Sequence, residues 1–487
     1  MEHYFKDRKT KIICTIGPSS NTKEMIEKMR EKGMNIARLN FSHGTHEDHL
    51  KVINAIKEVN KNLEVPIGIM LDTKGPEIRI GKFKEPITLK DNEKILITTK
   101  EIEWCDDKII GISYENLPSI VSKGSYIYIA DGTVELKVES ILDNGTDIEC
   151  IVSIGGEVNT RKNVNVPGAI VDLPGVSEQD IEDIVFGIKN GIDFIAQSFV
   201  KTPEDVLEVR KILANYNADH VAMISKIESF QALELIDKII DVSDGIMVAR
   251  GDLGVQIPIE NIPSVQKSII HKCNLKGKPV ITATQMLESM TKNPRPTRAE
   301  ATDVANAILD GSDAVMLSGE TASGKHPLRA IDIMDKIARK TEKNLKFRSF
   351  EINSILHEDK EEAEYKPTIT DSISKSVCSN SAELKASAII TCTSTGHTAR
   401  QISRHKPLVP IIAVTPNEKE FRKLVLSWGV RPVLINYPEN TDSLINDSLE
   451  TLKAKGLVKE FDLVVITAGI PFNISGNINL MKIEMIK

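Results

Sequence analysis

The chain has 487 residues, enough for about three domains, and its 41% hydrophobic and 27% charged residues are typical of soluble globular proteins. Its 69 acidic and 62 basic residues give a formal net charge of −7 without a basic block, so we expect no nucleic-acid partner. The six cysteines are scattered, which predicts reduced thiols and neither a disulfide framework nor a zinc site. No apolar run reaches about 18 residues, so we expect a cytoplasmic protein without membrane contact.

Short apolar segments recur along the chain, and helix-like stretches such as 264–276 and 297–309 follow them. The segments expected to form strands are 11–16, 34–39, 67–71, 193–197, 221–226, 244–248, 279–284 and 313–317. Regular alternation of this kind is typical of parallel α/β folds. Eight such units predict a closed parallel β/α (TIM) barrel.

The step from the third of these strands to the fourth is too long for one βα unit, and its residues change character. Apolar and polar residues alternate there at 87–99, 125–130, 134–140 and 147–153. Turn dipeptides such as Asp131-Gly132 separate these stretches, as in antiparallel sheets. We therefore predict an inserted all-β domain, a β-barrel lid, at residues 75–172. The catalytic barrel would comprise residues 1–74 and 173–345.

A charged stretch at 357–367 marks a further boundary beyond a long helical segment. After it, apolar segments at 387–392, 410–416, 431–436 and 462–469 alternate with helical patterns. This pattern predicts a C-terminal doubly wound α/β domain at residues 346–487.

Charged side chains lie at the ends of two consecutive expected strands. Because side chains on a strand alternate between faces, Lys226 and Glu228 should point the same way, and Asp252 follows the next strand. The active sites of β/α barrels lie at the C-terminal ends of their strands. A cation and two carboxylates there suit a site for phosphate and a divalent metal. Taken alone, Lys226 and Glu228 would equally fit a surface ion pair.

Three segments of the chain resemble pyruvate kinase closely and stand in the expected order. They are VAMISKIESFQAL at 221–233, ARGDLG at 249–254 and PTRAEATDVANAILDGSDAVMLSGETA at 296–322. The order of barrel, inserted β-domain and C-terminal α/β domain is also similar along essentially the whole chain. The resemblance implies transfer of the phosphoryl group of phosphoenolpyruvate to ADP, which gives pyruvate and ATP in the last step of glycolysis. It also implies a homotetramer.

The resemblance assigns the central catalytic roles to four residues. Glu228 and Asp252 would hold Mg²⁺ or Mn²⁺, with water and substrate completing the coordination. Lys226 would stabilise charge on the phosphoryl group and the enolate. Arg38 would contact the transferring phosphate, which suits a permanently charged, forked donor.

A turn at 250–252 would bind the carboxylate of the substrate. Backbone N–H groups of Gly251 and Asp252 could receive this anion, as turns commonly do. Thr284 would add its hydroxyl group by resemblance. Without the resemblance, Thr284 would also fit a strand-end threonine that caps the next helix.

A cluster of oxygen ligands follows the second and third strands. By resemblance, Asn40, Ser42, Asp72 and Thr73 hold K⁺, although loop hydrogen bonding would explain such residues without that context. Members of the family with glutamate at the position of Glu77 generally need a monovalent cation. Members with lysine there carry their own positive charge.

Nucleotide contacts are expected from both the barrel and the inserted domain. The resemblance gives Asn40 and His43 such a role, although a lone strand-end histidine is as often structural. Arg79 would contact nucleotide phosphates from the base of the inserted domain. Lys162 would reach them when that domain closes, and the neighbouring Arg161 could share this role.

Two alternatives belong to other classes of protein. A phosphoenolpyruvate or pyruvate lyase also uses a metal in a β/α barrel, but it needs neither a closing domain with Lys162 nor a K⁺ cluster. A non-catalytic sugar-phosphate sensor would not need the intact Lys226 and its carboxylates. Ser318 and Glu320 could order a proton-relaying water, or they could form a packing turn.

A loop in the C-terminal domain resembles the effector loop of the family. Its hydroxyl and backbone groups precede a helix at 399, which is typical of a phosphate site, although an N-capping turn would also fit. The residues expected to contact the effector are Thr393, Ser394, Thr395, Gly396 and Thr398. The opposite wall would be the loop 469–477, which contains no arginine or lysine.

We predict that any effector is a monophosphate, such as AMP or a pentose or hexose phosphate. A second phosphate without a partner charge would be costly to desolvate in this loop pair. Saturation with phosphoenolpyruvate, measured with each candidate present, checks this prediction. Strong activation by fructose 1,6-bisphosphate, together with no response to monophosphates, would contradict it.

Overall fold

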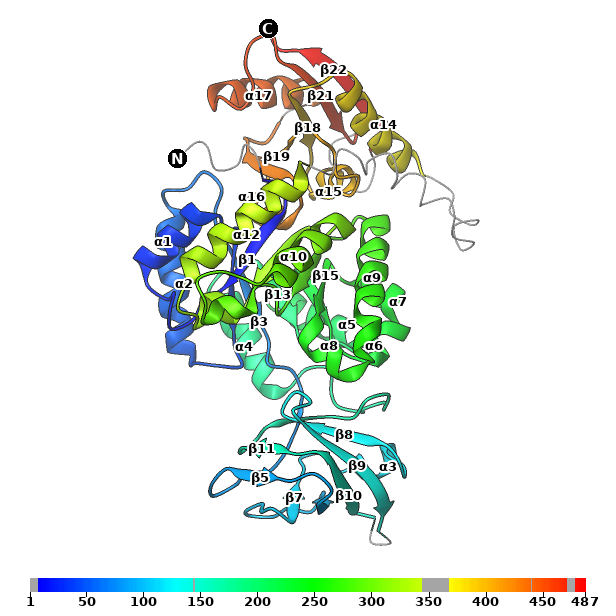
Figure 1. The fold of residues 1–487 in the computed structure, drawn as a ribbon. Coiled ribbons are helices and arrows are strands. Elements are labelled where there is room, and N and C mark those ends of the chain that lie inside the picture. The colour runs from blue at the N-terminus through cyan, green and yellow to red at the C-terminus, as the bar shows by residue number, and fades with distance from the viewer. Residues whose placement is uncertain (1–7, 143–144, 344–367, 439, 471–477) are drawn as a thin grey trace.

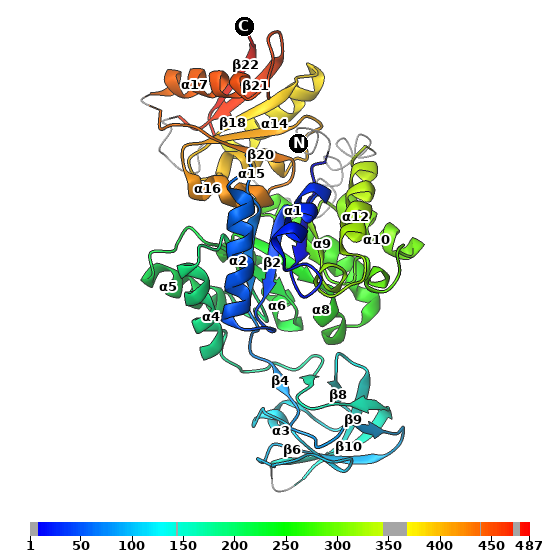
Figure 2. The same ribbon diagram turned by 90° about the vertical axis from the view of Figure 1, so that its left-hand side faces the viewer.

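The computed structural model describes residues 8–142, 145–343, 368–438, 440–470 and 478–487. A central β/α barrel lies between an all-β part and a C-terminal α/β part, so the molecule is elongated (Figures 1 and 2). The chain enters and leaves the all-β part from the same end of the barrel. None of the described helices is long and apolar enough to cross a membrane.

All of the strands predicted for the barrel are present, and they close into a parallel barrel. They are β1 (Lys11–Thr15), β2 (Ile36–Asn40), β3 (Gly68–Asp72), β13 (Phe194–Gln197), β14 (Ala222–Ile227), β15 (Gly245–Ala249), β16 (Val280–Ala283) and β17 (Ala314–Leu317). The prediction of a TIM barrel is therefore confirmed. Apolar side chains from alternate strand positions fill its interior, and the remaining strand faces pack under the helices.

The barrel helices surround the strands. They are α1 (Lys23–Lys32), α2 (His46–Asn60), α4 (Glu178–Lys189), α5 (Pro203–Asn215), α6 (Phe230–Glu234), α7 (Ile236–Val242), α8 (Arg250–Gln256), α9 (Ile262–Lys276), α10 (Arg298–Asp310), α11 (Gly319–Ala322) and α12 (Pro327–Glu342). Four of them begin with a capping box, at Thr45, Ser177, Thr202 and Thr297. These boxes satisfy free N–H groups and so define where each helix starts.

The inserted part is a mainly antiparallel sheet with short edge strands, accompanied by a separate two-stranded sheet. Its elements are β4 (Ile78–Arg79), β5 (Ile87–Leu89), β6 (Lys94–Thr98), β7 (Ile109–Gly111), α3 (Leu117–Ile120), β8 (Tyr126–Ile129), β9 (Val134–Ile141), β10 (Asp147–Ile154), β11 (Gly156–Val158) and β12 (Asn163–Asn165). The main sheet has the order β4-β12-β8-β9-β10-β6-β7, in which β6 and β7 pair in parallel, and β5 and β11 form the separate sheet. A bridge between Ile80 and Ile112 joins its two edges, so the sheet curls around its own apolar core.

The C-terminal part is a five-stranded sheet in the order β20-β19-β18-β21-β22. Its elements are α14 (Ile369–Glu383), β18 (Ala388–Cys392), α15 (His397–Ser403), β19 (Ile411–Thr415), α16 (Glu418–Lys423), β20 (Val430–Leu434), α17 (Thr441–Ala454), β21 (Leu463–Ala468) and β22 (Leu480–Met485). The sequence analysis missed β22, an exposed antiparallel edge strand with little apolar alternation. The predicted boundary at residues 345 and 346 lies outside the described residues.

A short segment of the C-terminal part closes the N-terminal end of the barrel. The 3₁₀ turn η5 (Leu424–Leu426) follows α16, and its Val425 and Leu426 join the apolar cluster inside the barrel. Both side chains are almost fully buried there. The barrel interior is thus completed by residues more than a hundred positions beyond its last strand.

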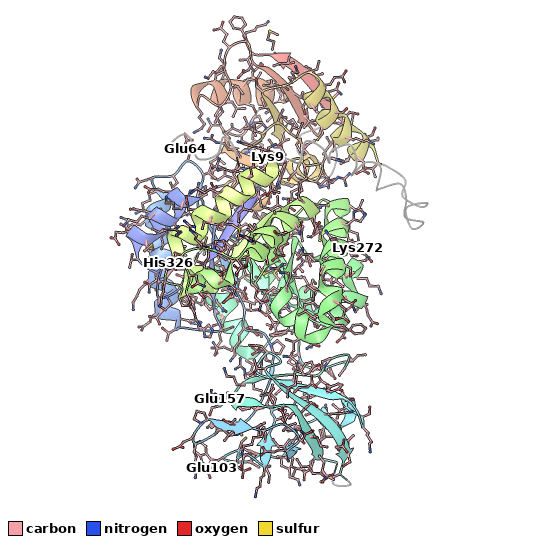
Figure 3. All side chains as sticks on the ribbon, viewed as in Figure 1. Lys9, Glu64, Glu103, Glu157, Lys272 and His326 are labelled. Carbon is pink, nitrogen blue, oxygen red and sulfur yellow. The ribbon has the colours of Figure 1, made fainter. Side chains whose placement is uncertain are left out.

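A buried ion pair and an aromatic ring reinforce this junction. Lys9 and Lys406 lie over the ring of Trp428, at 5.1 and 5.2 Å from its centroid. The carboxylate of Asp313 accepts hydrogen bonds from Lys406 Nζ at 2.9 Å and from the backbone N–H of Trp428 at 3.3 Å. Figure 3 shows Lys9 where the barrel meets the C-terminal part.

We predict that Asp313→Ala destabilises the protein by about 3–5 kcal/mol, because it leaves the ammonium of Lys406 buried without its partner. Urea unfolding measures this change. Asp237→Ala is the matched control, since its exposed ion pair with Lys272 on α9 should contribute only about 0–1 kcal/mol. Equal stability losses in the two variants would contradict the prediction.

Candidate active site

Lys226 is the centre of a buried cluster at the C-terminal end of β14. Its Nζ lies 2.9 Å from Glu228 Oε1, 2.7 Å from Ser198 Oγ and 3.2 Å from Asp72 Oδ1. Lys226 and Glu228 therefore share one face of the strand, as predicted. The side chain of Lys226 is only 11% exposed, so this is no surface ion pair.

A second cation shares the carboxylate of Asp72. Arg38 Nε donates to Asp72 Oδ2 at 2.5 Å, and Arg38 Nη1 donates to Thr15 Oγ1 at 2.9 Å. The two hydrogen bonds fix the guanidinium at the end of β2. Arg38 and Lys226 thus face the same spot from neighbouring parts of the barrel.

The charges in this cluster determine its protonation states. Burial alone would lower the pKa of Lys226, but the carboxylates of Asp72 and Glu228 raise it well above its ordinary value. Burial alone would raise the pKa of Asp72, but Arg38 and Lys226 lower it. The cluster therefore holds two fixed positive charges at neutral pH.

Glu228 and Asp252 form a carboxylate pair beside Lys226. Glu228 Oε2 accepts the backbone N–H of Phe199 at 2.7 Å, which orients the carboxylate. Burial and the charge of Glu228 raise the pKa of Asp252 to about 7. Two buried carboxylates that lie close together repel each other. A divalent cation bound between them would neutralise this repulsion, so the pair is a suitable metal site.

The segment around Asp252 differs from its prediction. It was expected to be a turn with free N–H groups, but Arg250 to Gln256 form the helix α8. The N–H of Gly251 donates to Thr284 Oγ1 at 2.9 Å, while Arg250 Nη2 donates to the Thr284 carbonyl at 2.7 Å. Thr284 has a positive φ of 66°, a left-handed backbone conformation that a β-branched residue rarely adopts. The structure brings Gly251 and Thr284 together, but it pairs them with each other.

The residues expected to hold K⁺ lie at the adjoining ends of β2 and β3. Asn40 and Asp72 are register partners, and Asn40 Oδ1 accepts the N–H of Ser42 at 3.1 Å. The hydroxyl and carbonyl oxygens of Thr73 both bond to Ser198. The side-chain and carbonyl groups of this set offer hard oxygen donors that suit K⁺. Asp72 would be shared with Arg38 and Lys226.

The expected nucleotide contacts are less tightly assembled. Arg79 pairs with Glu77 and donates to the Arg161 carbonyl at 2.8 Å. Lys162 and His43 are exposed, and among the described residues no side-chain hydrogen bond or ion pair joins either of them to the Lys226 cluster. The structure thus places Arg79 in the edge strand β4 of the inserted sheet and leaves Lys162 and His43 on the surface.

The predicted effector loop lies between β18 and α15. Thr393 and Thr398 are buried, and Gly396 has a positive φ of 73° at the start of the helix. Arg400 folds back onto the loop and donates to the Thr395 carbonyl at 2.8 Å. The sequence analysis overlooked this guanidinium. Of the opposite wall, residues 471–477 lie outside the described residues.

Three residues of the cluster were missed by the sequence analysis. Ser198, Phe199 and Thr15 each bond to a predicted site residue. Ser198 directly follows Gln197, the last residue of β13, whose side chain donates to the Asp205 carbonyl. The one signal available was a polar residue just after the fourth barrel strand.

The barrel and its site define a class of enzyme. Two fixed cations, a carboxylate pair and a set of neutral oxygen ligands meet where a barrel strand leads into an inserted domain. This arrangement is suited to phosphoryl transfer, in which charge neutralisation and alignment matter more than covalent catalysis.

Comparisons with known proteins agree with this class. Family models described as "Pyruvate kinase, barrel domain" and "Pyruvate kinase, alpha/beta domain" match residues 7–331 and 371–484. A pyruvate kinase of Clostridium acetobutylicum is 47% identical over 487 residues, which covers 99% of this chain and 100% of that protein. A pyruvate kinase of Geobacillus stearothermophilus is 47% identical over 480 residues, which covers 98% of this chain and 80% of that protein.

A solved structure supports the same relationship. The pyruvate kinase from Cryptosporidium parvum has a TM-score of 0.91 and 41% identity, and the match covers 100% of this chain and 98% of that chain. The chain belongs to the pyruvate kinase family and is a phosphotransferase.

We predict that binding of Mn²⁺ or Mg²⁺ weakens about tenfold per pH unit below pH 7, because a proton must leave Asp252 before the metal binds. Above pH 7 the carboxylate is already charged, so the affinity should level off. Isothermal titration calorimetry between pH 5.5 and 8 measures this dependence. In Asp252→Asn the affinity should be low at every pH, and a slope that persists there would contradict the assignment.

Proposed function

We propose that this chain transfers the phosphoryl group of phosphoenolpyruvate to ADP, and that Lys226 and its partners carry the chemistry. The observation that carries the proposal is the buried cluster of Lys226, Arg38 and Glu228 around Asp72. It lies at the end of the barrel where catalysis is expected. Pyruvate, ATP and the last step of glycolysis follow from the family.

Lys226 acts on charge that develops during the reaction. Its ammonium is held by acceptors on three sides, so it need not reorganise when negative charge grows on the bridging oxygen of the substrate. Its raised pKa keeps it protonated. Arg38, fixed by Asp72 and Thr15, contacts the transferring phosphoryl group with its remaining N–H donors.

Glu228 and Asp252 would hold Mg²⁺ or Mn²⁺. When bound there, the cation would supply neutralisation of the negative charge on the substrate. The N–H of Phe199 holds Glu228 in position for this role. Thr284 and the start of α8 at Gly251 bind the substrate carboxylate once their mutual hydrogen bond opens.

The inserted domain brings nucleotide-binding groups to the barrel. Arg79 stands in its first strand, β4, and Lys162 directly precedes its last strand, β12. The domain already touches the barrel, since Gln256 Nε2 donates to Asn165 Oδ1 at 2.8 Å. We propose that closure of this domain brings Lys162 onto the phosphates of ADP or ATP, with Asn40 and His43 on the barrel side.

The reaction itself is tested by following pyruvate formation from phosphoenolpyruvate with and without ADP. Pyruvate that forms only with ADP supports the proposal. Pyruvate formation without ADP would indicate hydrolysis, with water as the phosphoryl acceptor. No pyruvate under any condition would indicate a lyase with another substrate or a binding protein.

We predict that Lys226→Met lowers kcat about 10²–10³-fold with little change in KM, because the lost charge acts mainly in the transition state. Steady-state kinetics measure both constants. Glu228→Gln should in addition raise the metal concentration required for activity. Near-normal turnover of Lys226→Met would overturn the assignment.

We also propose that K⁺ is required, through Asn40, Ser42, Asp72 and Thr73. Glu77 supports this, because it stands where K⁺-independent relatives carry a lysine. Burial raises the pKa of Glu77, against the lowering effect of Arg79, and Glu228 also raises it. The side chain therefore lies within electrostatic range of the metal-binding carboxylate.

We predict that replacing K⁺ by Na⁺ or Tris lowers activity about tenfold or more, which corresponds to about 1.4 kcal/mol in the barrier. Glu77→Lys should reduce this dependence, since a tethered ammonium replaces the ion. Initial rates at constant ionic strength measure both effects. Full activity of the unmodified protein without K⁺ would show that the cation site is absent.

Regulation and assembly remain proposals from the family. A phosphorylated effector would bind at the loop before α15, where Arg400 could pair with a phosphate. A cytoplasmic homotetramer is the assembly that the family suggests. Analytical ultracentrifugation, with and without substrates, tests the assembly.

A further inference from the structure

One loop of the barrel contacts both catalytic side chains and both connections of the inserted domain. This loop, residues 198–201, follows β13 and is called the β13 loop. Its Ser198 is 2% exposed, and the φ of Phe199 is +53°. A side chain as bulky as phenylalanine rarely adopts this left-handed backbone unless its surroundings require it.

On the catalytic side, the β13 loop forms hydrogen bonds with two side chains, those of Lys226 and Glu228. Ser198 Oγ accepts from Lys226 Nζ at 2.7 Å. The N–H of Phe199 donates to Glu228 Oε2 at 2.7 Å, and the left-handed backbone aims it there. The loop therefore positions the ammonium and one metal-binding carboxylate together.

On the other side, the β13 loop bonds to and packs against the first connection to the inserted domain. Ser198 Oγ donates to the Thr73 carbonyl at 2.6 Å, and the Ser198 N–H donates to Thr73 Oγ1 at 3.0 Å. Gly75 packs against the loop without spare room, since a Cβ there would lie 2.7 Å from Phe199 Cδ2 and 2.9 Å from Ser198 Cβ. Its φ of +74° also requires glycine.

The returning connection meets the same loop. Lys201 Nζ donates to the carbonyl of Leu173. The chain thus leaves the barrel beside Ser198 and comes back beside Lys201. Any movement of the inserted domain about these two connections pulls on the loop that holds Lys226 and Glu228.

We propose that Ser198 is a positioning residue, whose hydroxyl group couples the position of Lys226 to the start of the first connection, residues 73–75. This segment is called the hinge of the inserted domain. A single oxygen accepts from the catalytic ammonium and donates to the hinge carbonyl, so a shift of either group moves the other. Closure of the inserted domain over its substrate then fixes the position of the Lys226 ammonium. This inference rests on the proposed role of Lys226.

The first test compares Ser198→Ala with Ser225→Ala. Ser225 is also buried and lies on β14 next to Lys226, but its hydroxyl pairs with Ser243 Oγ at 2.6 Å on the opposite face. Ser198→Ala should lower kcat about 10- to 100-fold with KM little changed, as expected for a misplaced catalytic group. Ser225→Ala should leave kcat near normal. The kcat of Ser198→Cys should lie between those of the unmodified protein and Ser198→Ala, because the thiol is a weak donor and acceptor.

A double-mutant cycle separates positioning from a general structural role. In a Lys226→Met background, Ser198→Ala should cause little further loss, because the group that it positions is already gone. Additive losses would overturn the proposal, as would a kcat of Ser198→Ala equal to that of Ser225→Ala. Normal turnover of Lys226→Met would instead refute the proposed function itself.

Hydrogen exchange of the hinge gives a readout that does not depend on activity. Coupling is reciprocal, so exchange in peptides containing residues 73–75 should quicken both in Ser198→Ala and in Lys226→Met, without ligands. Ser225→Ala should leave it unchanged. Unaltered hinge exchange in both of the first two variants would overturn the coupling, even if their activities fall.

Discussion

The site depends on one constraint, the burial of Asp72 between two cations. Arg38 and Lys226 each need a partner where water is largely excluded, and Asp72 serves both. A buried charge without its partner is strongly destabilising, so the three groups fix one another. Glu228 is the second partner of Lys226, so two cations face two carboxylates in the cluster. A divalent metal held by Glu228 and Asp252 would add the positive charge that suits a phosphorylated, anionic substrate.

The barrel supplies rigidity to this cluster from both ends. At the C-terminal end, Arg38, Asp72 and Lys226 stand on β2, β3 and β14, so the register of the parallel strands sets the distances among these three side chains. At the opposite end, the segment with Val425 and Leu426 fills the barrel interior. The C-terminal part is therefore continuous with the core under the active site.

The inserted domain is attached where it can affect catalysis. Its first connection begins at Thr73, directly after the carboxylate that pairs with Lys226. A hinge elsewhere on the barrel could close over the substrate without disturbing the cluster. Here the hinge, Ser198 and Lys226 share hydrogen bonds, so lid movement and lysine placement are physically linked. Such a link helps to keep the charges aligned only when the substrate is enclosed.

The sequence by itself determined the barrel, the all-β insertion and the pairing of Lys226 with Glu228, because strand alternation and strand order are local properties. It also located Asp252, but it predicted a turn where the chain begins α8, since helix starts depend on what the first N–H groups meet. Only the tertiary structure decided that Ser198 and Phe199 belong to the site. Their partners lie 28 or 29 positions away, or on the far side of the insertion. A serine after a strand carries no local signal, and its role arises from the closure of the barrel, which brings distant strand ends together.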